Sequence, residues 1–270
     1  VQQHEIEFSE VCAPVVRIKT IRLILALAGS NGWKIHHLDV QSVFLNGELD
    51  EEVYVSQPDG YQKKGEAHNV YKLSKALYGL KHCLDRHLKS LGFKRCAYEY
   101  SIYTKKEGKD TLIVGVYVDD LLVTGSCTEN IQICKRDMNI KFEMRERGRG
   151  SDVLVIEVNQ KGDGITLKQE AYARNLLIKT GMQDCNPTRT PMQQKLRLRS
   201  DEEGELVNNT EYQSIVGALR YLTHTGPDIS FAVWIVSRFM EKPALKHLQV
   251  VKMILRCIKG TLDFGLRYSR

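Results

Sequence analysis

The strongest constraint in this sequence is a β-rich apolar run that two adjacent aspartates interrupt. Residues Thr111–Thr124 are mostly β-branched or apolar on both sides of Asp119 and Asp120. Because aspartate is favoured in turns, this pattern predicts two strands joined into a β-hairpin. A carboxylate beside a half-buried sheet is costly unless it is hydrogen-bonded, paired or bound to a cation. The two acids therefore either face solvent in the turn or belong to a binding site.

Asp39 is a third acid in apolar β-sequence, near the end of the predicted strand Trp33–Val40. One Asp on a strand that faces an Asp pair on a hairpin can hold two divalent ions ~3.5–4 Å apart, the arrangement for in-line phosphoryl transfer. Hard oxygen ligands select Mg²⁺ or Mn²⁺ over zinc. We predict such a metal site at Asp39, Asp119 and Asp120. The alternative role for Asp39 is to cap the segment that follows it.

Periodicity along the rest of the chain predicts a mixed α/β, or α+β, fold. A further strand is expected over Val153–Val158, before a tight turn at Gly162–Gly164. The second half of the chain is expected to be mostly helical. Helices are expected over Ile18–Ala28, Lys81–Leu91, Gln169–Gly181, Glu211–Thr223 and Ala244–Lys259, with one more beginning after Pro227.

Composition and missing motifs exclude several classes of protein. Hydrophobic residues are 42% and charged residues 27% of the chain, which is typical of a globular protein. No apolar run approaches the ~20 residues that cross a bilayer, and no signal-peptide stretch is present, so we expect a cytoplasmic protein without membrane contact. Seven cysteines without a Cys-x-x-Cys pair argue against a disulfide framework or a zinc knuckle. Hydrolase and P-loop motifs are absent, and His36 and His37 would point to opposite faces of a strand.

Positive charge is concentrated at the C-terminal end of the chain. The net charge is +6, and residues Arg238–Arg270 contain eight Lys or Arg against two acids. Lys252, Arg256 and Lys259 are spaced to share one face of the last predicted helix, where they could follow a phosphate backbone. A solvated helix face explains the same pattern, so both interpretations stay open.

Several segments strongly resemble the reverse transcriptase of copia-type retrotransposons. The resemblance rests on Leu38–Leu49, which contains Leu-Asp-Val and Phe-Leu-Asn-Gly, on Lys72–Lys81, and on the sequence Tyr-Val-Asp-Asp at Tyr117–Asp120. It continues through Tyr212–Tyr221 and Lys259–Asp263. The matching segments follow the family's order over nearly the whole chain.

The resemblance implies a right-hand polymerase that lacks its fingers. The palm, an antiparallel sheet backed by helices, would occupy residues 1–160, followed by a thumb in 161–200 and a connection in 201–270 that leads toward an absent ribonuclease H domain. The implied activity is RNA-directed DNA synthesis, in which two Mg²⁺ or Mn²⁺ ions activate the primer 3′-hydroxyl and neutralise the phosphates. The implied partners are an RNA or DNA template-primer, deoxynucleoside triphosphates, and the integrase and ribonuclease H of a Pol polyprotein.

Two aromatic residues complete the site that the resemblance implies. Phe44 falls where such enzymes carry a bulky ring beneath the sugar of the incoming nucleotide, which excludes a 2′-hydroxyl. Tyr117 would lie near the primer end. Simple packing in the core is the alternative for each of them.

The chain departs from the family pattern in ways that predict lost activity. Besides the fingers, a short stretch is missing after Lys81, from the helix that lies under the templating base pair. Because a ~1 Å misplacement can cost ~100-fold in rate, we expect this chain to be inactive or nearly so. The alternative function is a non-catalytic, degenerate retroelement remnant that at most binds nucleic acid. A nucleotidyl cyclase-like palm is a second alternative, which the sequence around Phe44 and the basic C-terminal end disfavour.

Overall fold

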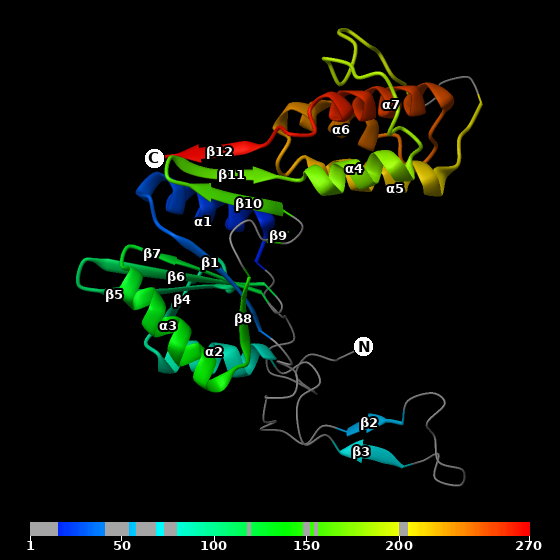
Figure 1. Ribbon diagram of the computed structural model, residues 1–270. Coiled ribbons are helices and arrows are strands. Elements are labelled where there is room, and N and C mark those ends of the chain that lie inside the picture. The colour runs from blue at the N-terminus through cyan, green and yellow to red at the C-terminus, as the bar shows by residue number, and fades with distance from the viewer. Residues whose placement is uncertain are drawn as a thin grey trace. The chain divides into compact units, whose positions relative to one another are not determined.

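The protein forms two compact units in the computed structural model, Val1–Gly148 and Arg149–Arg270, each considered by itself (Figure 1). Asp119 and Phe44 lie outside the residues that the structure describes. The described residues are 16–40, 54–57, 69–72, 80–117, 120–147, 152–153, 156–199 and 205–270.

The first unit is built on a six-stranded antiparallel sheet with the strand order β4-β5-β6-β7-β1-β8. A separate two-stranded ribbon pairs β2 (Tyr54–Ser56) with β3 (Val70–Lys72). The strands of the large sheet are β1 (Ile35–Val40), β4 (Lys94–Arg95), β5 (Ile102–Glu107), β6 (Asp110–Tyr117), β7 (Asp120–Gly125) and β8 (Met144–Arg147).

Helices cover both faces of the large sheet (Figure 1). On one face lies α1 (Ile18–Asn31), whose Ile24 side chain would be 3.2 Å from a Cβ at Gly115 of β6. On the other face, α2 (Leu80–Ser90) and α3 (Thr128–Lys141) share an apolar core with alternate residues of β1, β6 and β7. Successive residues of a strand point to opposite faces of the sheet. The strand residues that lie in the core with α2 and α3 therefore define one face, and the residues between them point to the α1 side.

The β-hairpin predicted around the aspartate pair is confirmed. Strands β6 and β7 are antiparallel neighbours, and Tyr117 pairs with Asp120. Asp120 is therefore the first residue of β7 rather than part of the turn. Leu121 and Val123 of β7 are each 1% exposed and lie in the core shared with α2 and α3. Residues of β6 lie in the same core, so burial explains why the sequence is apolar on both sides of the aspartates.

The second unit combines a four-stranded antiparallel sheet, in the order β12-β11-β10-β9, with helices around an apolar core. Gly164 begins β11 with φ +148°, and a Cβ there would lie 2.3 Å from the Tyr268 carbonyl oxygen, so this position needs glycine. The elements are β9 (Asp152–Val153), β10 (Ile156–Lys161), β11 (Gly164–Lys168), α4 (Glu170–Lys179), α5 (Asn209–Leu222), the 3₁₀-helix η2 (Pro227–Ile229), α6 (Ser230–Ser237), α7 (Leu245–Gly260) and β12 (Leu266–Ser269).

Two features of the second unit differ from expectation. The single strand predicted over Val153–Val158 is wrong, because Val153 of β9 pairs with Ile156 of β10 in two antiparallel strands. Strand β12 is not predicted from the sequence, and it adds the C-terminal residues to β11. The boundary between the units precedes β10, whereas the predicted palm extends to residue 160. The names palm, thumb and connection stay predictions.

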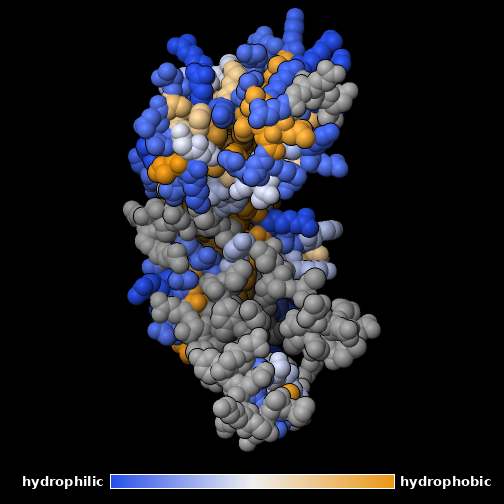
Figure 2. Space-filling model, turned by 90° about the vertical axis from the view of Figure 1, so that its right-hand side faces the viewer, coloured by the Kyte–Doolittle hydropathy of each residue, from blue (hydrophilic) through white to orange (hydrophobic). Residues whose placement is uncertain are grey.

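The surface of the protein mixes polar and apolar side chains. Figure 2 shows the second unit, at the top of the view, as a mainly hydrophilic surface with apolar side chains gathered in patches. Phe231 and Trp234 of α6 are exposed, with ring centroids 6.2 Å apart, and the Arg238 guanidinium lies 5.5 Å from the Trp234 ring. Across the described ranges, every helix is too short or too polar to cross a membrane.

Two leucines on α1 test its packing against the sheet. Leu25 is 0% exposed and Leu23 is 68% exposed, although they are two residues apart on the same helix. We expect Leu25→Ala to lower the free energy of unfolding by about 2–5 kcal/mol, because it leaves a cavity under the helix. Leu23→Ala should change it by less than about 0.5 kcal/mol. Urea unfolding of both variants measures the difference, and equal losses would contradict the placement of α1.

Candidate active site

Asp39 and Asp120 are direct neighbours on adjacent strands. Strands β1 and β7 are antiparallel, and their register pairs Asp39 with Asp120. Side chains that are directly opposite in such a pair have Cβ atoms about 4.5–5.5 Å apart, and like charges there destabilise the sheet. Both residues are partly exposed. The sheet therefore holds two carboxylates together at one end, where a cation would offset their repulsion.

Arg145 lies on the other side of Asp39. Strand β1 is between β7 and β8, and the β1–β8 register pairs Asp39 with Arg145. Asp39 thus has the negatively charged Asp120 opposite it on β7 and the positively charged Arg145 opposite it on β8. Sequence reasoning missed Arg145 because the four-residue β8 has no strand pattern of its own.

His37 contacts the second carboxylate of the site. Its ring Nε2 is 2.7 Å from Oδ1 of Asp120, and the ring is buried. His37 and Asp39 are two residues apart on β1, so they project from the same face of the sheet. The prediction that His36 and His37 point to opposite faces is consistent with their partners, since His36 bonds to Glu146 instead.

Behind the carboxylates, a polar network joins three elements of the first unit. Glu146 of β8 lies 2.7 Å from His36 Nδ1 of β1 and 2.6 Å from Lys135 Nζ of α3. Burial raises the pKa of Glu146, but hydrogen bonds and positive charge from Lys135 and His36 outweigh this, so its pKa is lower than usual. The network ties β1 to β8 and α3 on the face opposite Asp39.

The carboxylate pair suits a hard divalent cation. Asp39 and Asp120 supply oxygen ligands from a sheet, and oxygen is the donor that Mg²⁺ and Mn²⁺ prefer. The residues that the structure describes contain no group of three or more His, Cys, Asp or Glu side chains that could hold a metal. Asp119, the third predicted ligand, falls outside those residues. The two described carboxylates fit a metal site, and their completion by Asp119 stays a prediction.

The other predicted site residues do not all lie near the carboxylates. Tyr117 ends β6, pairs with Asp120 and is half-buried, so it lies beside the carboxylates. Phe44, like Asp119, lies outside the described residues. Lys252, Arg256 and Lys259 all belong to α7, in the second unit.

The three basic residues on α7 differ in their surroundings. Lys252 is exposed, and Lys259 is half-buried. Arg256 Nε donates a hydrogen bond of 2.7 Å to the Asn186 carbonyl oxygen, and the Thr188 amide donates to the Arg256 carbonyl oxygen. Arg256 thus fastens the loop after α4 to α7. This structural bond leaves the nitrogens of the guanidinium end for other contacts.

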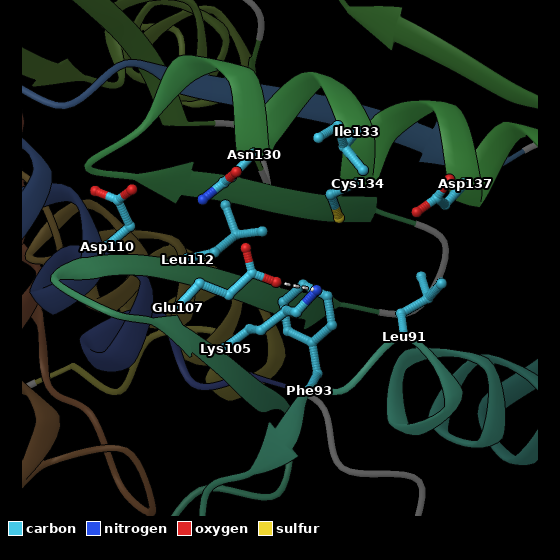
Figure 3. Close-up of a pocket in the computed structure, with 10 residues that line it drawn as sticks. All are labelled: Leu91, Phe93, Lys105, Glu107, Asp110, Leu112, Asn130, Ile133, Cys134 and Asp137. Carbon is cyan, nitrogen blue, oxygen red and sulfur yellow. Dashed lines mark ion pairs between the residues drawn. The ribbon is translucent and has the colours of Figure 1, made fainter.

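The first unit contains a pocket whose lining residues, drawn in Figure 3, do not include the carboxylate pair. Its cavity volume is about 80 Å³, and the Lys105–Glu107 ion pair of 2.6 Å lies at its edge. Burial raises the pKa of the Cys134 thiol in its wall to about 11, which keeps this thiol neutral at ordinary pH. Asp110, which also lines the pocket, begins β6, whereas Tyr117 ends it, roughly 23 Å away along the strand. The pocket therefore does not serve the acidic site.

Fold and site together define a mixed α/β protein with opposed carboxylates at one end of an antiparallel sheet, which is consistent with a reverse transcriptase domain. The chain belongs to the family described as reverse transcriptase (RNA-dependent DNA polymerase), whose model matches residues 1–194. The predicted resemblance to copia-type elements is confirmed.

Relatives from plants and yeast support this membership. The chain is 36% identical over 98% of its length to the retrovirus-related Pol polyprotein from transposon RE1 of Arabidopsis thaliana. It is 34% identical over 96% of its length to that from transposon TNT 1-94 of Nicotiana tabacum. It spans only 19% and 21% of these two relatives. A putative transposon Ty5-1 protein of Saccharomyces cerevisiae is 31% identical, over 86% of this chain and 78% of its own.

The lowered pKa of Glu146 predicts a pH-dependent contribution to stability. We expect Glu146→Gln to destabilise the protein at pH 7 by up to about 1 kcal/mol, a small effect because the pair is partly solvent-screened. Since the folded-state pKa lies below the usual 4.5, the advantage of the wild type should persist above pH 4.5 and shrink as the pH falls through the lowered value. Urea unfolding at several pH values measures it. The exposed Glu143→Gln is the control, and a difference that grows on acidification would contradict this origin.

Proposed function

We propose that this chain is the nucleotidyl-transfer domain of a copia-type reverse transcriptase, with Asp39, Asp119 and Asp120 as its metal ligands. The observation that carries the proposal is the register that places Asp39 of β1 opposite Asp120 of β7. Reverse transcriptases generally use divalent metal ions, and bound Mg²⁺ or Mn²⁺ would supply charge for activating a primer 3′-hydroxyl and stabilising a leaving diphosphate.

The residues of this chain have distinct tasks in that proposal. The carboxylates of Asp39 and Asp120 place negative charge at one end of the sheet, and Arg145 offers a positive charge beside Asp39 for a phosphate. Tyr117, paired with Asp120, would contact the end of the primer. Phe44 would exclude nucleotides that carry a 2′-hydroxyl.

The proposed substrates are deoxynucleoside triphosphates and an RNA or DNA template-primer. Lys252 and Lys259 on α7 would bind its phosphates, together with the free end of the Arg256 guanidinium. Because these relatives are named Pol polyproteins, the chain is proposed to be part of one, beside the integrase and ribonuclease H that the family resemblance implies.

A second candidate function is that of a non-catalytic remnant. It is favoured by the short stretch that, by the resemblance to the family, is missing after Lys81, at the start of α2. Catalysis requires reactants held near attack geometry, and a shortened support displaces the base pair from it. In this proposal the metal ligands remain, while polymerisation is weak or lost.

Metal binding tests the carboxylate site directly. We expect Mn²⁺ to raise the melting temperature of the wild-type protein, because it offsets repulsion between the opposed carboxylates. Asp120→Asn and Asp39→Asn should each remove most of this increase, since each removes one charge at nearly constant shape. Asp110→Asn, at the other end of β6, is the matched control and should respond like the wild type. The same increase in all variants would show that Mn²⁺ binds elsewhere.

Primer extension separates the two candidate functions. On a primed RNA template with Mg²⁺ or Mn²⁺, we expect no synthesis above that of the Asp39→Asn/Asp120→Asn double variant, because of the missing stretch after Lys81. Template-dependent synthesis above that control would establish an active polymerase and refute the expected inactivity. A filter-binding assay on the same template shows whether the protein still binds nucleic acid.

A further inference from the structure

The geometry points to His37 as a positioning residue that holds the carboxylate of Asp120, a role that rests on the proposed metal site. His37 lies two residues before Asp39 on β1, and its ring Nε2 is 2.7 Å from Oδ1 of Asp120 on β7. The His37 side chain is 4% exposed and the Asp120 side chain 24% exposed. A buried donor thus fixes a proposed metal ligand that is partly exposed to solvent.

The direction of this hydrogen bond follows from the two groups. An ionised carboxylate has only acceptor sites, so Nε2 of His37 carries the proton and donates it to Oδ1. The bond occupies Oδ1 and leaves Oδ2 as an oxygen for a cation. It also restricts rotation of the carboxylate, and this loss of freedom would otherwise be a cost of metal binding.

Asp120 needs such a restraint because of its position. It is the first residue of β7 and lies opposite Asp39, whose like charge pushes its carboxylate away. His37 belongs to the same strand as Asp39, so its hydrogen bond draws the Asp120 carboxylate toward β1. Groups that orient metal ligands in this way typically contribute 10–100-fold to metal affinity.

His36 provides an internal comparison. It is the neighbour of His37 on β1 and also makes a bond of 2.7 Å to a carboxylate, that of Glu146. Its bond lies on the opposite face of the sheet, away from Asp39 and Asp120. Both histidines therefore contribute to the packing of β1, but only His37 touches a proposed metal ligand.

The experiment measures two properties of the full chain: Mn²⁺ affinity by calorimetry, and the melting temperature in EDTA. His37→Leu removes the donor at similar volume, and we expect it to weaken Mn²⁺ binding about 10–100-fold. His37→Gln, whose amide nitrogen can occupy the place of Nε2, should restore most of the affinity. His36→Leu should lower the melting temperature in EDTA while the Mn²⁺ affinity stays within about twofold of the wild type.

The outcomes distinguish the positioning role from the metal site itself. If the wild type binds Mn²⁺, Asp120→Asn does not, and His37→Leu binds like the wild type, the positioning role is wrong and the metal site stands. If the wild type binds no Mn²⁺, or Asp120→Asn binds it equally well, both are wrong. Equal weakening in His36→Leu and His37→Leu would assign the effect to the stability of β1, which also overturns the role.

One variant covers the case in which His37→Leu fails to fold. If it shows no cooperative unfolding in EDTA, His37→Asn replaces it, because its amide remains polar but ends one bond short of the position of Nε2. We expect the same weakening of Mn²⁺ binding from His37→Asn. Affinity equal to that of the wild type in this variant would refute the positioning role.

Discussion

Cross-strand pairing of β1 with β7 on one side and β8 on the other is the constraint on which the candidate site depends. This pairing sets Asp39 between Asp120 and Arg145 and places His37 within reach of Asp120. The side-chain period of a strand is two residues, so a slip of one residue would turn Asp39 to the opposite face. The position of every group in the site is thus a consequence of register.

Burial on both faces of the sheet fixes that register. Leu38 of β1 and Leu121 of β7 pair with each other and enter the core beneath α2 and α3. On the α1 side, Ile24 packs over Gly115, where no side chain separates the helix from β6. A slip would exchange buried leucines for charged residues, at a cost of several kcal/mol in lost burial and desolvated charge. The same packing that stabilises the fold therefore holds two acids together.

Strand β1 contributes polar side chains to a different cluster of charges on each face of the sheet. On one face, Glu146 is held by His36 and Lys135, which joins the edge strand β8 to α3. On the other, Asp39 and Asp120 are opposed, with His37 bonded to Asp120 and Arg145 paired with Asp39. Hydrogen-bonded charges on one face thus anchor β1 to its neighbours, while the two opposed carboxylates lie on the other face.

The sequence by itself determined part of the local structure, and it singled out the acids Asp39, Asp119 and Asp120. The apolar runs around Asp120 specify β6 and β7, and helical spacing specifies α1, α4, α5 and α7. It did not reveal α3, because Ile133 and Ile140 are exposed and blur the periodicity of its buried residues. Nor did it reveal that His37 and Arg145 lie beside these acids. His37 and Asp120 are separated by 83 positions in the chain, and local propensity carries no information on such pairings. Only the tertiary structure decided them, because register is set by which residues the helices bury on each face of the sheet.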